Sequence, residues 1–197
     1  MKLSPNLLIA AYCQGIFPMA DEDGSIEWYE PDPRAIIPID TFRVPRRLAR
    51  TVRSRRFEIR CNYDFRAVIE ACAAPSPGRE STWISPQIID AYTELHQFGF
   101  AHSVETWREN RLAGGLYGVA IRGLFAGESM FSHDRDASKV ALVHLVDRLR
   151  RGGYVLLDTQ FIVNDHMQQF GVLEIPHEEY KVRLAAALKV DATFPTI

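Results

Sequence analysis

The chain has 197 residues, of which 47% are hydrophobic and 11% are aromatic, so it can bury a substantial core and is not an intrinsically disordered chain. Its formal net charge of −2 argues against a general nucleic-acid binder, although an average can hide a segregated patch of charge. No apolar run approaches the roughly 20 residues that span a bilayer, and the first residues lack a signal-peptide pattern. We therefore expect a cytoplasmic protein with no membrane segment.

The cysteines and histidines form no pattern typical of a disulfide or metal site. Cys13, Cys61 and Cys72 are odd in number and include no C-x-x-C pair. The six histidines include no H-E-x-x-H motif. We predict free thiols, no metal and no cofactor.

The first third of the chain combines a helix, a loop and a basic segment. Residues 5–14 predict a helix ended by a glycine, and residues 15–34 predict an ordered, irregular loop whose aromatics are core anchors or stacking platforms. Residues 43–60 then contain eight arginines and a single acid, Glu58.

A helix opened at Pro45 would place several of these arginines on one face. A run of charge is ordinarily a solvated helix face, but such faces usually mix signs, and the arginine fork suits phosphate oxygens. We therefore predict that this basic stripe contacts a phosphate backbone. Its members are Arg46, Arg47, Arg50, Arg53 and Arg56.

The remaining residues alternate between helical and strand patterns. From residue 85 onward the order is helix, three-stranded meander, helix, strand, helix, which predicts a mixed α/β (α+β) fold with helices packed on a mainly antiparallel sheet. The expected helices cover residues 64–73, 85–98, 137–151, 164–170 and 178–189, and the expected strands cover residues 101–107, 111–121, 124–132 and 154–159.

Two of the strands carry polar residues that need an explanation. Glu128 lies in an otherwise apolar strand, where a carboxylate needs either an ion pair to a neighbouring helix or a ligand. Asp158 and Gln160 end a second apolar strand, and alternation places both side chains on one face. Strand ends often use Asp and Gln as caps, so this pattern alone is not specific. The sequence contains no G-x-S-x-G, P-loop or dinucleotide-binding motif and no evident Cys/His nucleophile pair.

A set of short sequence blocks runs in order over nearly the whole chain. The blocks are YCQGIFP at 12–18, WYEPDPR at 28–34, TWI at 82–84, AHSVE at 101–105, GGLYGV at 114–119, GESMFS at 127–132, ASK at 137–139 and LDTQ at 157–160. These blocks resemble those of the leucyl/phenylalanyl-tRNA–protein transferase family, and together they are far more specific than any one of them. Many members have Trp where this chain has Met19, and longer members have more residues before the first block.

The resemblance implies a two-domain aminoacyltransferase. Residues 1–62 would form a small N-terminal domain with the basic helix, and residues 63–197 a catalytic domain with the fold of the GCN5-related acetyltransferases. The enzyme would move Leu or Phe from Leu-tRNA or Phe-tRNA to proteins that begin with Arg or Lys, which creates an N-degron. We expect a monomer that needs no cofactor.

The resemblance also matches Glu128, Asp158 and Gln160 to the family's active-site polar residues. Our hypothesis for their roles is that Asp158 orients the acceptor amine and favours loss of its proton, Gln160 holds the amine or the carbonyl in line, and Glu128 fixes the donor or its neighbours. The general base stays open, and proton transfer through the terminal ribose of the tRNA is an alternative. The expected substrate-binding residues are Trp83 and Tyr92 near the aminoacyl-adenosine, Phe125 and Met130 in an apolar amino-acid pocket, and in addition Leu116 and Ser132; the basic stripe would hold the tRNA.

Three alternatives stay open. A CoA-dependent acyltransferase would need a glycine-rich turn that binds pyrophosphate, whereas residues 133–139 contain no glycine and two acids. A second alternative is a tRNA-dependent transferase with another acceptor, such as a cell-wall peptide, or another donor. A third is a non-catalytic RNA-binding protein.

Overall fold

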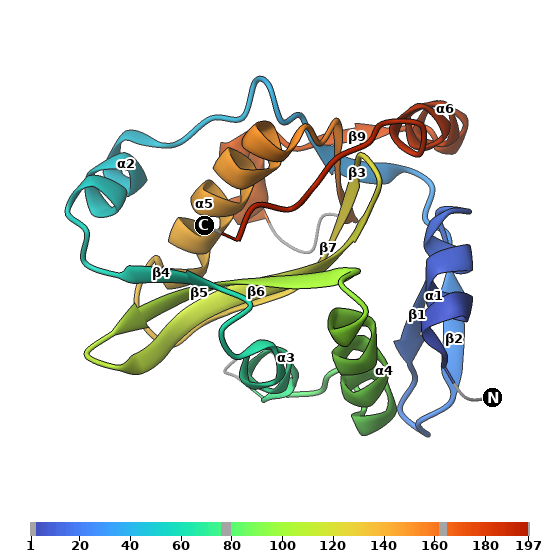
Figure 1. The fold of residues 1–197 in the computed structure, drawn as a ribbon, viewed down its shortest axis with the longest axis horizontal. Helices are drawn as coiled ribbons and strands as arrows, with labels where there is room; N and C mark the ends of the chain where they lie inside the picture. The colour runs from blue at the N-terminus through green and yellow to red at the C-terminus, as the bar shows by residue number, and fades with distance from the viewer. Residues whose placement is uncertain (1–2, 76–79, 162–164, 197) are drawn as a thin grey trace.

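The fold is built on one large twisted sheet, which the computed structural model describes within residues 3–75, 80–161 and 165–196 (Figure 1). Seven strands pair in the order β4-β5-β6-β7-β8-β3-β9, and only β7 and β8 are parallel neighbours. A separate two-stranded sheet pairs β1 with β2. The strands are β1 Phe17–Ala20, β2 Ile26–Tyr29, β3 Arg34–Ile37, β4 Glu58–Cys61, β5 Ala101–Arg108, β6 Arg111–Ile121, β7 Leu124–Ser132, β8 Leu156–Gln160 and β9 Leu173–Ile175.

The α-helices begin close to where the sequence places them. Ser4, Asp64 and Ser85 each accept a hydrogen bond from a backbone N–H of the first turn of the helix that follows, which satisfies a donor with no partner inside the helix. The α-helices are α1 Pro5–Tyr12, α2 Arg46–Arg53, α3 Phe65–Ala73, α4 Pro86–Gln97, α5 Ala137–Gly152 and α6 His177–Ala187.

The mixed α/β prediction with a mainly antiparallel sheet is confirmed, and several local predictions are wrong. Residues 15–34 contain the β1–β2 hairpin, not only an irregular loop. The strands β3, β4 and β9 are additional to the predicted ones, because strands of four residues or fewer are too short to show a period. The last part of the expected helix at 164–170 is a 3₁₀ helix, η1 Asp165–Phe170, and residue 164 lies outside the described residues.

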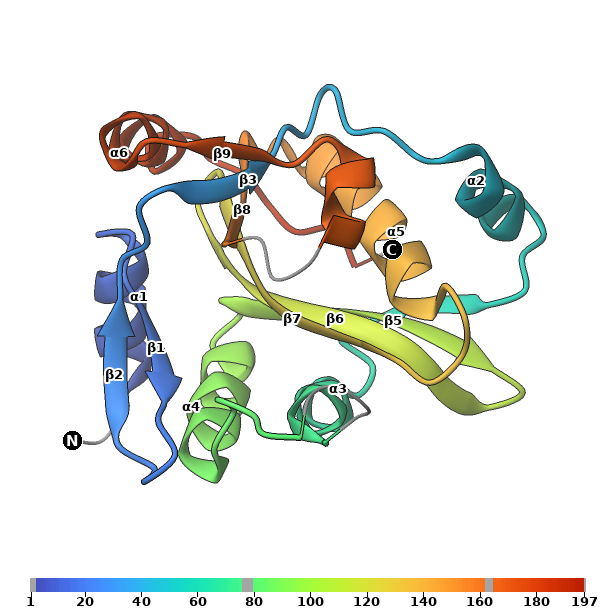
Figure 2. The same cartoon turned by 180° about the vertical axis from the view of Figure 1, so that it is seen from behind.

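Each face of the large sheet has its own layer of helices. The helix α5 packs on β5, β6 and β7 on one face, and α3 and α4 cover the other face (Figures 1 and 2). The helix α1 lies beside α4 at the edge of this second layer, with the hairpin next to it. The sheet therefore separates the two large apolar cores of the described residues, which we name the α5 core and the α4 core, and a third, smaller cluster includes Tyr180 and Leu184 of α6.

Three register shifts interrupt the described part of the large sheet; one lies between β5 and β6 at Thr106 and Trp107, and the other two lie near each other. The β6–β7 register steps from Gly118 opposite Gly127 to Tyr117 opposite Ser129, so Glu128 is the extra residue of β7. The β3–β8 register shifts in the same way, which leaves Thr159 as the extra residue of β8. Bulges redirect side chains and are frequent next to active sites.

The parallel pairing of β7 and β8 ends at these bulges. Its last paired residues are Ala126 and Asp158. Beyond that point β7 continues along β6 to its end, whereas β8 stays with β3. The two strands therefore part where the bulged residue Glu128 leaves the ladder.

The strands β3 and β4 precede residue 62 and pair within the seven-stranded sheet. The expected division of the chain at residues 62 and 63 stays a prediction. Among the described residues, no helix is both long and apolar enough to cross a membrane.

The close approach of β6 to β7 yields a stability prediction. A Cβ atom at Gly118 would lie 2.4 Å from the Ala126 carbonyl oxygen and 2.4 Å from the Phe125 ring, whereas a Cβ atom at Gly127 would meet only the Asp158 carbonyl oxygen, at 3.5 Å. We expect Gly118→Ala to lower the free energy of unfolding by about 1–3 kcal/mol in urea titrations. The register partner provides the control: Gly127→Ala should be neutral or raise it by up to about 1 kcal/mol. Equal values for the two variants would contradict this account.

Candidate active site

The bulged residue Glu128 is the centre of a partly buried polar cluster. Its Oε1 atom accepts hydrogen bonds from the Tyr12 hydroxyl at 2.7 Å and from Gln160 Nε2 at 2.9 Å. Its Oε2 atom is buried and has no hydrogen-bond partner among the described residues. One oxygen of this carboxylate is thus held in place and the other is free to accept a bond from a ligand. The alternative of an ion pair to a helix is wrong, because no described cation lies within ion-pair distance of Glu128.

The environment of Glu128 opposes its ionisation. Burial raises the pKa of Glu128 from 4.5 to about 7, and the negative charge of Asp158 adds to that rise. The hydrogen bonds from Tyr12 and Gln160 and the charge of Arg34 act in the opposite direction without cancelling it. A carboxyl group with a pKa near 7 can both accept and release a proton at neutral pH.

Three tyrosines surround this carboxylate from the α4 core. Tyr12, Tyr92 and Tyr117 are all buried, and the hydroxyls of Tyr12 and Tyr92 share a hydrogen bond. Burial, together with the nearby Glu128, raises the pKa of each tyrosine well above its ordinary value, so the hydroxyls stay protonated. The Tyr117 hydroxyl has no hydrogen-bond partner among the described residues.

Asp158 lies beside this cluster, with both of its oxygens occupied. Its Oδ1 atom accepts bonds from Arg34 Nε at 2.9 Å and from the Gln160 backbone N–H at 2.8 Å. Its Oδ2 atom accepts bonds from Arg34 Nη2 at 2.7 Å and from the Tyr180 hydroxyl at 2.8 Å. Arg34 and Asp158 are 1% and 0% exposed, so this is a fully buried, bidentate ion pair.

Gln160 connects the two carboxylates. Its backbone N–H reaches Asp158 and its side-chain amide reaches Glu128. Its φ of +65° lies in the left-handed region, which a non-glycine residue adopts only where its surroundings hold it. The bulge at Thr159 and the Asp158 bond together place the Gln160 amide at Glu128.

The Arg34 guanidinium also binds the N-terminal segment. Its Nη1 atom donates to the Gly15 carbonyl at 2.9 Å, and its central carbon lies 5.0 Å from the Phe17 ring centroid and 4.5 Å from that of Tyr180. Gly15 has a φ of +77°, and a Cβ atom there would lie 2.8 Å from the Tyr180 ring. This position therefore requires glycine for both its backbone conformation and its contact.

The expected amino-acid pocket residues lie together on the other face of the sheet. Leu116 and Phe125 are buried in the α5 core, and the partly buried Met130 packs against it. Phe125 and Met130 are at odd and even positions and still share a face, because the bulge at Glu128 shifts the alternation by one residue. Phe194 from the C-terminal segment stacks on Phe125 with ring centroids 5.8 Å apart.

The other two expected substrate residues lie elsewhere. Trp83 packs against the α4 core just before α4, and its carbonyl accepts a bond from the Ala20 backbone N–H at 3.0 Å. Ser132 lies at the end of β7, where its Oγ atom accepts a bond at 2.9 Å from the backbone N–H of Ser138 in the first turn of α5. Ser132 is therefore bonded to α5 and not to the polar cluster around Glu128.

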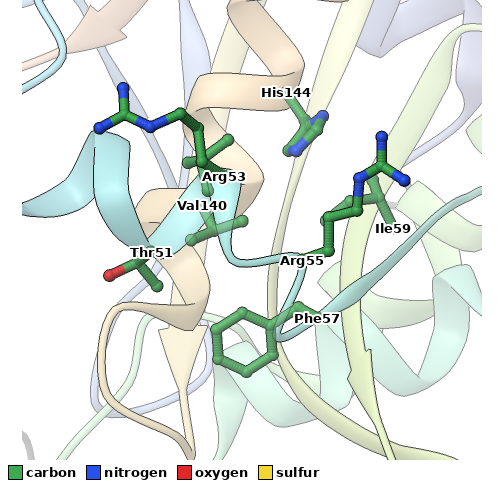
Figure 3. Close-up of a pocket in the computed structure, with 8 residues that line it drawn as sticks. Thr51, Arg53, Arg55, Phe57, Ile59, Val140 and His144 are labelled. Atoms are coloured by element: carbon green, nitrogen blue, oxygen red, sulfur yellow. The ribbon is translucent and has the colours of Figure 1, made fainter.

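The arginines of the basic stripe are exposed on and after α2, at the opposite end of the molecule from α1 (Figure 1). Of the five, only Arg56 has an acidic partner within ion-pair distance in the described part of the chain, Asp134 at 3.8 Å. A hollow of about 400 Å³ lies between α2 and α5, with Arg53 and Arg55 beside it and Phe57 and His144 in its lining (Figure 3). This surface is open to an anionic partner.

The sequence analysis did not predict four residues around Glu128 and Asp158: Tyr12, Arg34, Tyr117 and Tyr180. Arg34 gave a usable signal, since it begins the apolar run of β3 and a buried arginine requires a carboxylate. The three tyrosines gave no such signal, because a tyrosine on an apolar helix face or in an apolar strand is usually an ordinary core residue.

Comparison with known proteins identifies the chain. The family model described as "Leucyl/phenylalanyl-tRNA protein transferase" matches residues 36–185, and the model of its N-terminal domain matches residues 1–32. A leucyl/phenylalanyl-tRNA–protein transferase from Herpetosiphon aurantiacus is 58% identical over 98% of both chains. Another from Rhodopseudomonas palustris is 54% identical over 100% of this chain and 88% of its own length.

A solved structure described as L-PGS from Bacillus licheniformis is similar with a TM-score of 0.44 and 12% identity, covering 77% of this chain and 48% of that chain. The sequence relatives define the class of the protein, which is an aminoacyltransferase. The chain belongs to the leucyl/phenylalanyl-tRNA protein transferase family.

The raised pKa of Glu128 predicts a pH-dependent stability. Between pH 4.5 and about 7 the folded protein retains a proton that the unfolded chain has released. The free energy of unfolding should therefore fall as the pH rises through this window, by about 3 kcal/mol at most. Glu128→Gln should lack this fall, and the exposed Glu70→Gln should keep it. Urea titrations from pH 4 to 8 check this, and parallel curves for wild type and Glu128→Gln would refute it.

Proposed function

We propose that this chain moves Leu or Phe from aminoacyl-tRNA to the N-terminal Arg or Lys of acceptor proteins and thereby creates an N-degron. The observation that carries the proposal at the site is the free Oε2 atom of Glu128, a buried acceptor on a carboxyl group whose pKa is near 7. The proposal includes a cytoplasmic location and a monomeric chain, as the sequence predicts.

The reaction is an aminolysis of an ester. The α-amine nitrogen of the acceptor attacks the ester carbonyl carbon of the aminoacyl-tRNA, the new C–N bond forms, and the bond to the ribose oxygen breaks. The nitrogen loses a proton and the leaving oxygen gains one. The ester is already activated, so positioning can supply most of the rate, up to roughly 7–11 kcal/mol of the barrier.

Glu128 carries the proton in this proposal. Its free Oε2 accepts a proton from the attacking amine and returns it to the leaving oxygen, which a pKa of about 7 allows in both directions. The Tyr12 hydroxyl and the Gln160 amide hold Oε1, so that Oε2 faces the reactants. A second amide hydrogen of Gln160 is available for the substrate carbonyl.

Asp158 acts through Gln160 in this mechanism. Our hypothesis from the sequence is that Asp158 orients the acceptor amine, but each of its oxygens already accepts two hydrogen bonds from protein groups. Asp158 therefore supports the reaction by fixing the backbone N–H of Gln160. It is a positioning residue, whereas Glu128 and Gln160 contact the reactants.

In this proposal the apolar residues on the α5 face of the sheet select the amino acid that the donor tRNA carries. Leu116 and Phe125 belong to the α5 core, Met130 packs against it, and Met130 follows the point where β7 and β8 part. Methionine is adaptable enough to accept the shapes of both Leu and Phe side chains. Trp83 and Tyr92 would contact the terminal adenosine from the α4 face. Ser132 would lie at the edge of the substrate site, where it is bonded to α5.

The proposal includes a GCN5-related acetyltransferase-like fold for the catalytic part, as the family resemblance implies. The mixed α/β architecture with a mainly antiparallel sheet is consistent with it, and β7 and β8 separate after Ala126 and Asp158. The pyrophosphate site of CoA enzymes is not supported, because Ser132 occupies the Ser138 N–H and Asp134 lies next to the start of α5. This favours a tRNA donor over CoA.

The basic stripe is assigned to the phosphate backbone of the tRNA. Its arginines are exposed, and four of them have no acidic partner among the described residues: Arg46, Arg47, Arg50 and Arg53. Unpaired arginine forks on one surface suit phosphate oxygens.

The first test follows labelled leucine from Leu-tRNA to peptides. We expect transfer to a peptide beginning with Lys, none to a peptide beginning with Ala, and none when acetyl-CoA replaces the tRNA. Glu128→Gln should lower kcat by about 100-fold or more, because general acid–base catalysis contributes about 10²–10⁴-fold. Acetylation without tRNA, or full activity of Glu128→Gln, would overturn the respective parts of the proposal.

The second test measures tRNA affinity against salt concentration. The double substitution Arg50→Ala and Arg53→Ala should weaken binding and reduce the slope of log K against log salt by about 0.7–0.9 for each phosphate group that the variant no longer neutralises. The matched control is Arg66→Ala, which removes an exposed arginine paired with Glu70 and Asp90 on another surface. An unchanged slope in the double variant would place the tRNA elsewhere.

A further inference from the structure

We propose that Arg34 and Tyr180 are positioning residues for the transfer reaction, and that they act by clamping Asp158 so that Gln160 holds Glu128. This inference rests on the proposed function of Glu128 and Gln160. It assigns a role in catalysis to two residues that do not contact the reactants, one from β3 and one from α6.

Arg34 and Tyr180 form a clamp around Asp158. This clamp is fully buried, and with the Gln160 backbone N–H it occupies every available acceptor site on the Asp158 carboxylate. Arg34 donates two bonds to the carboxylate and a third to the Gly15 carbonyl, and Tyr180 donates the remaining bond to Oδ2. Tyr180 also stacks on the guanidinium, with its ring centroid 4.5 Å from the Arg34 central carbon. Asp158 can therefore neither rotate nor move without breaking bonds to two other elements, β3 and α6.

The clamp reaches the reactants through Gln160. The fourth bond to Asp158 comes from the Gln160 backbone N–H, at a residue whose φ is +65°. A left-handed conformation at glutamine relaxes unless its surroundings hold it. If Asp158 shifts, the Gln160 side chain loses its 2.9 Å bond to Glu128 Oε1.

An arginine is required at position 34 because of its shape. Its planar fork fits a carboxylate with two parallel bonds while a third donor points to another acceptor. A lysine ammonium is a point charge and cannot reproduce this fork, although it keeps the charge. Arg34→Lys therefore separates geometry from charge.

The charges of Arg34 and Asp158 also affect the pKa of Glu128. The groups that face Glu128 are the hydroxyls of Tyr12, Tyr92 and Tyr117, the Gln160 amide, the Asp158 carboxylate and the Arg34 guanidinium. Of these, Asp158 raises the pKa of Glu128 and Arg34 lowers it. Removal of Arg34 alone should raise that pKa, and removal of both charges should return it toward the wild-type value.

The kinetic test uses Arg34→Lys and Tyr180→Phe, with Arg66→Lys as the exposed control. We expect Arg34→Lys to lower kcat by at least about tenfold while KM for the aminoacyl-tRNA stays within about twofold, since small misplacements act on the reacting geometry. Tyr180→Phe should give a smaller loss of kcat. Near-wild-type kcat in Arg34→Lys, with the variant folded, would overturn the inference.

The titration test needs no activity and therefore separates this inference from the proposed function. The pKa of Glu128 would be read by NMR of ¹³C-glutamate-labelled free protein, with Glu128→Gln identifying the signal. We expect Arg34→Met to shift the titration to higher pH and the charge-neutral pair Arg34→Met with Asp158→Asn to shift it back. If Arg34→Met does not fold, Asp158→Asn alone decides, because removal of the Asp158 charge should shift the titration to lower pH. Single-charge variants that titrate like wild type would overturn the clamp even if the wild-type enzyme transfers leucine as proposed.

Discussion

The buried pair of Arg34 and Asp158 joins parts of the chain that are far apart in sequence. Arg34 begins β3, Asp158 lies near the end of β8, the Gly15 carbonyl follows α1, and Tyr180 belongs to α6. A buried ion pair is not in itself evidence of high stability, because desolvation offsets much of its attraction, but the loss of one partner costs about 3–5 kcal/mol. The pair therefore specifies geometry: β8 and the N-terminal segment meet in one arrangement.

That arrangement allows a carboxyl group to be held in an environment that opposes its charge. Glu128 is placed by a bulge, bonded at one oxygen and left free at the other. The desolvation that raises its pKa is a cost to folding at neutral pH. Such a cost is typical of active sites, where the surroundings of a carboxyl group adjust its pKa to the reaction even though the protein becomes less stable.

The bulges and the parting of β7 from β8 lie between residues on opposite faces of the sheet. The sheet separates the α4 core, with Tyr92, from the α5 core, with Phe125. The parallel ladder ends at Ala126 and Asp158, next to the bulged residue Glu128. Under the proposed function, the adenosine end of the donor lies on one side and its amino-acid side chain on the other.

The sequence by itself determined the long elements and the chemical identity of most of the site. The helices from Pro86 and Ala137 and the strands from Arg111 and Leu124 have periods and end signals long enough to predict them, and the strand pattern singled out Glu128, Asp158 and Gln160 as polar residues that need an explanation. Family resemblance added the expectation that these three residues lie in the active site. Only the tertiary structure decided that Asp158 is fully occupied by Arg34, Tyr180 and Gln160, and that Glu128 has one free oxygen. The bonds of Arg34 to Asp158 and of Tyr12 to Glu128 join residues more than 100 positions apart, the bond of Tyr180 to Asp158 spans 22 positions, and the position of Glu128 depends on a one-residue bulge. Local periodicity contains no information about any of these.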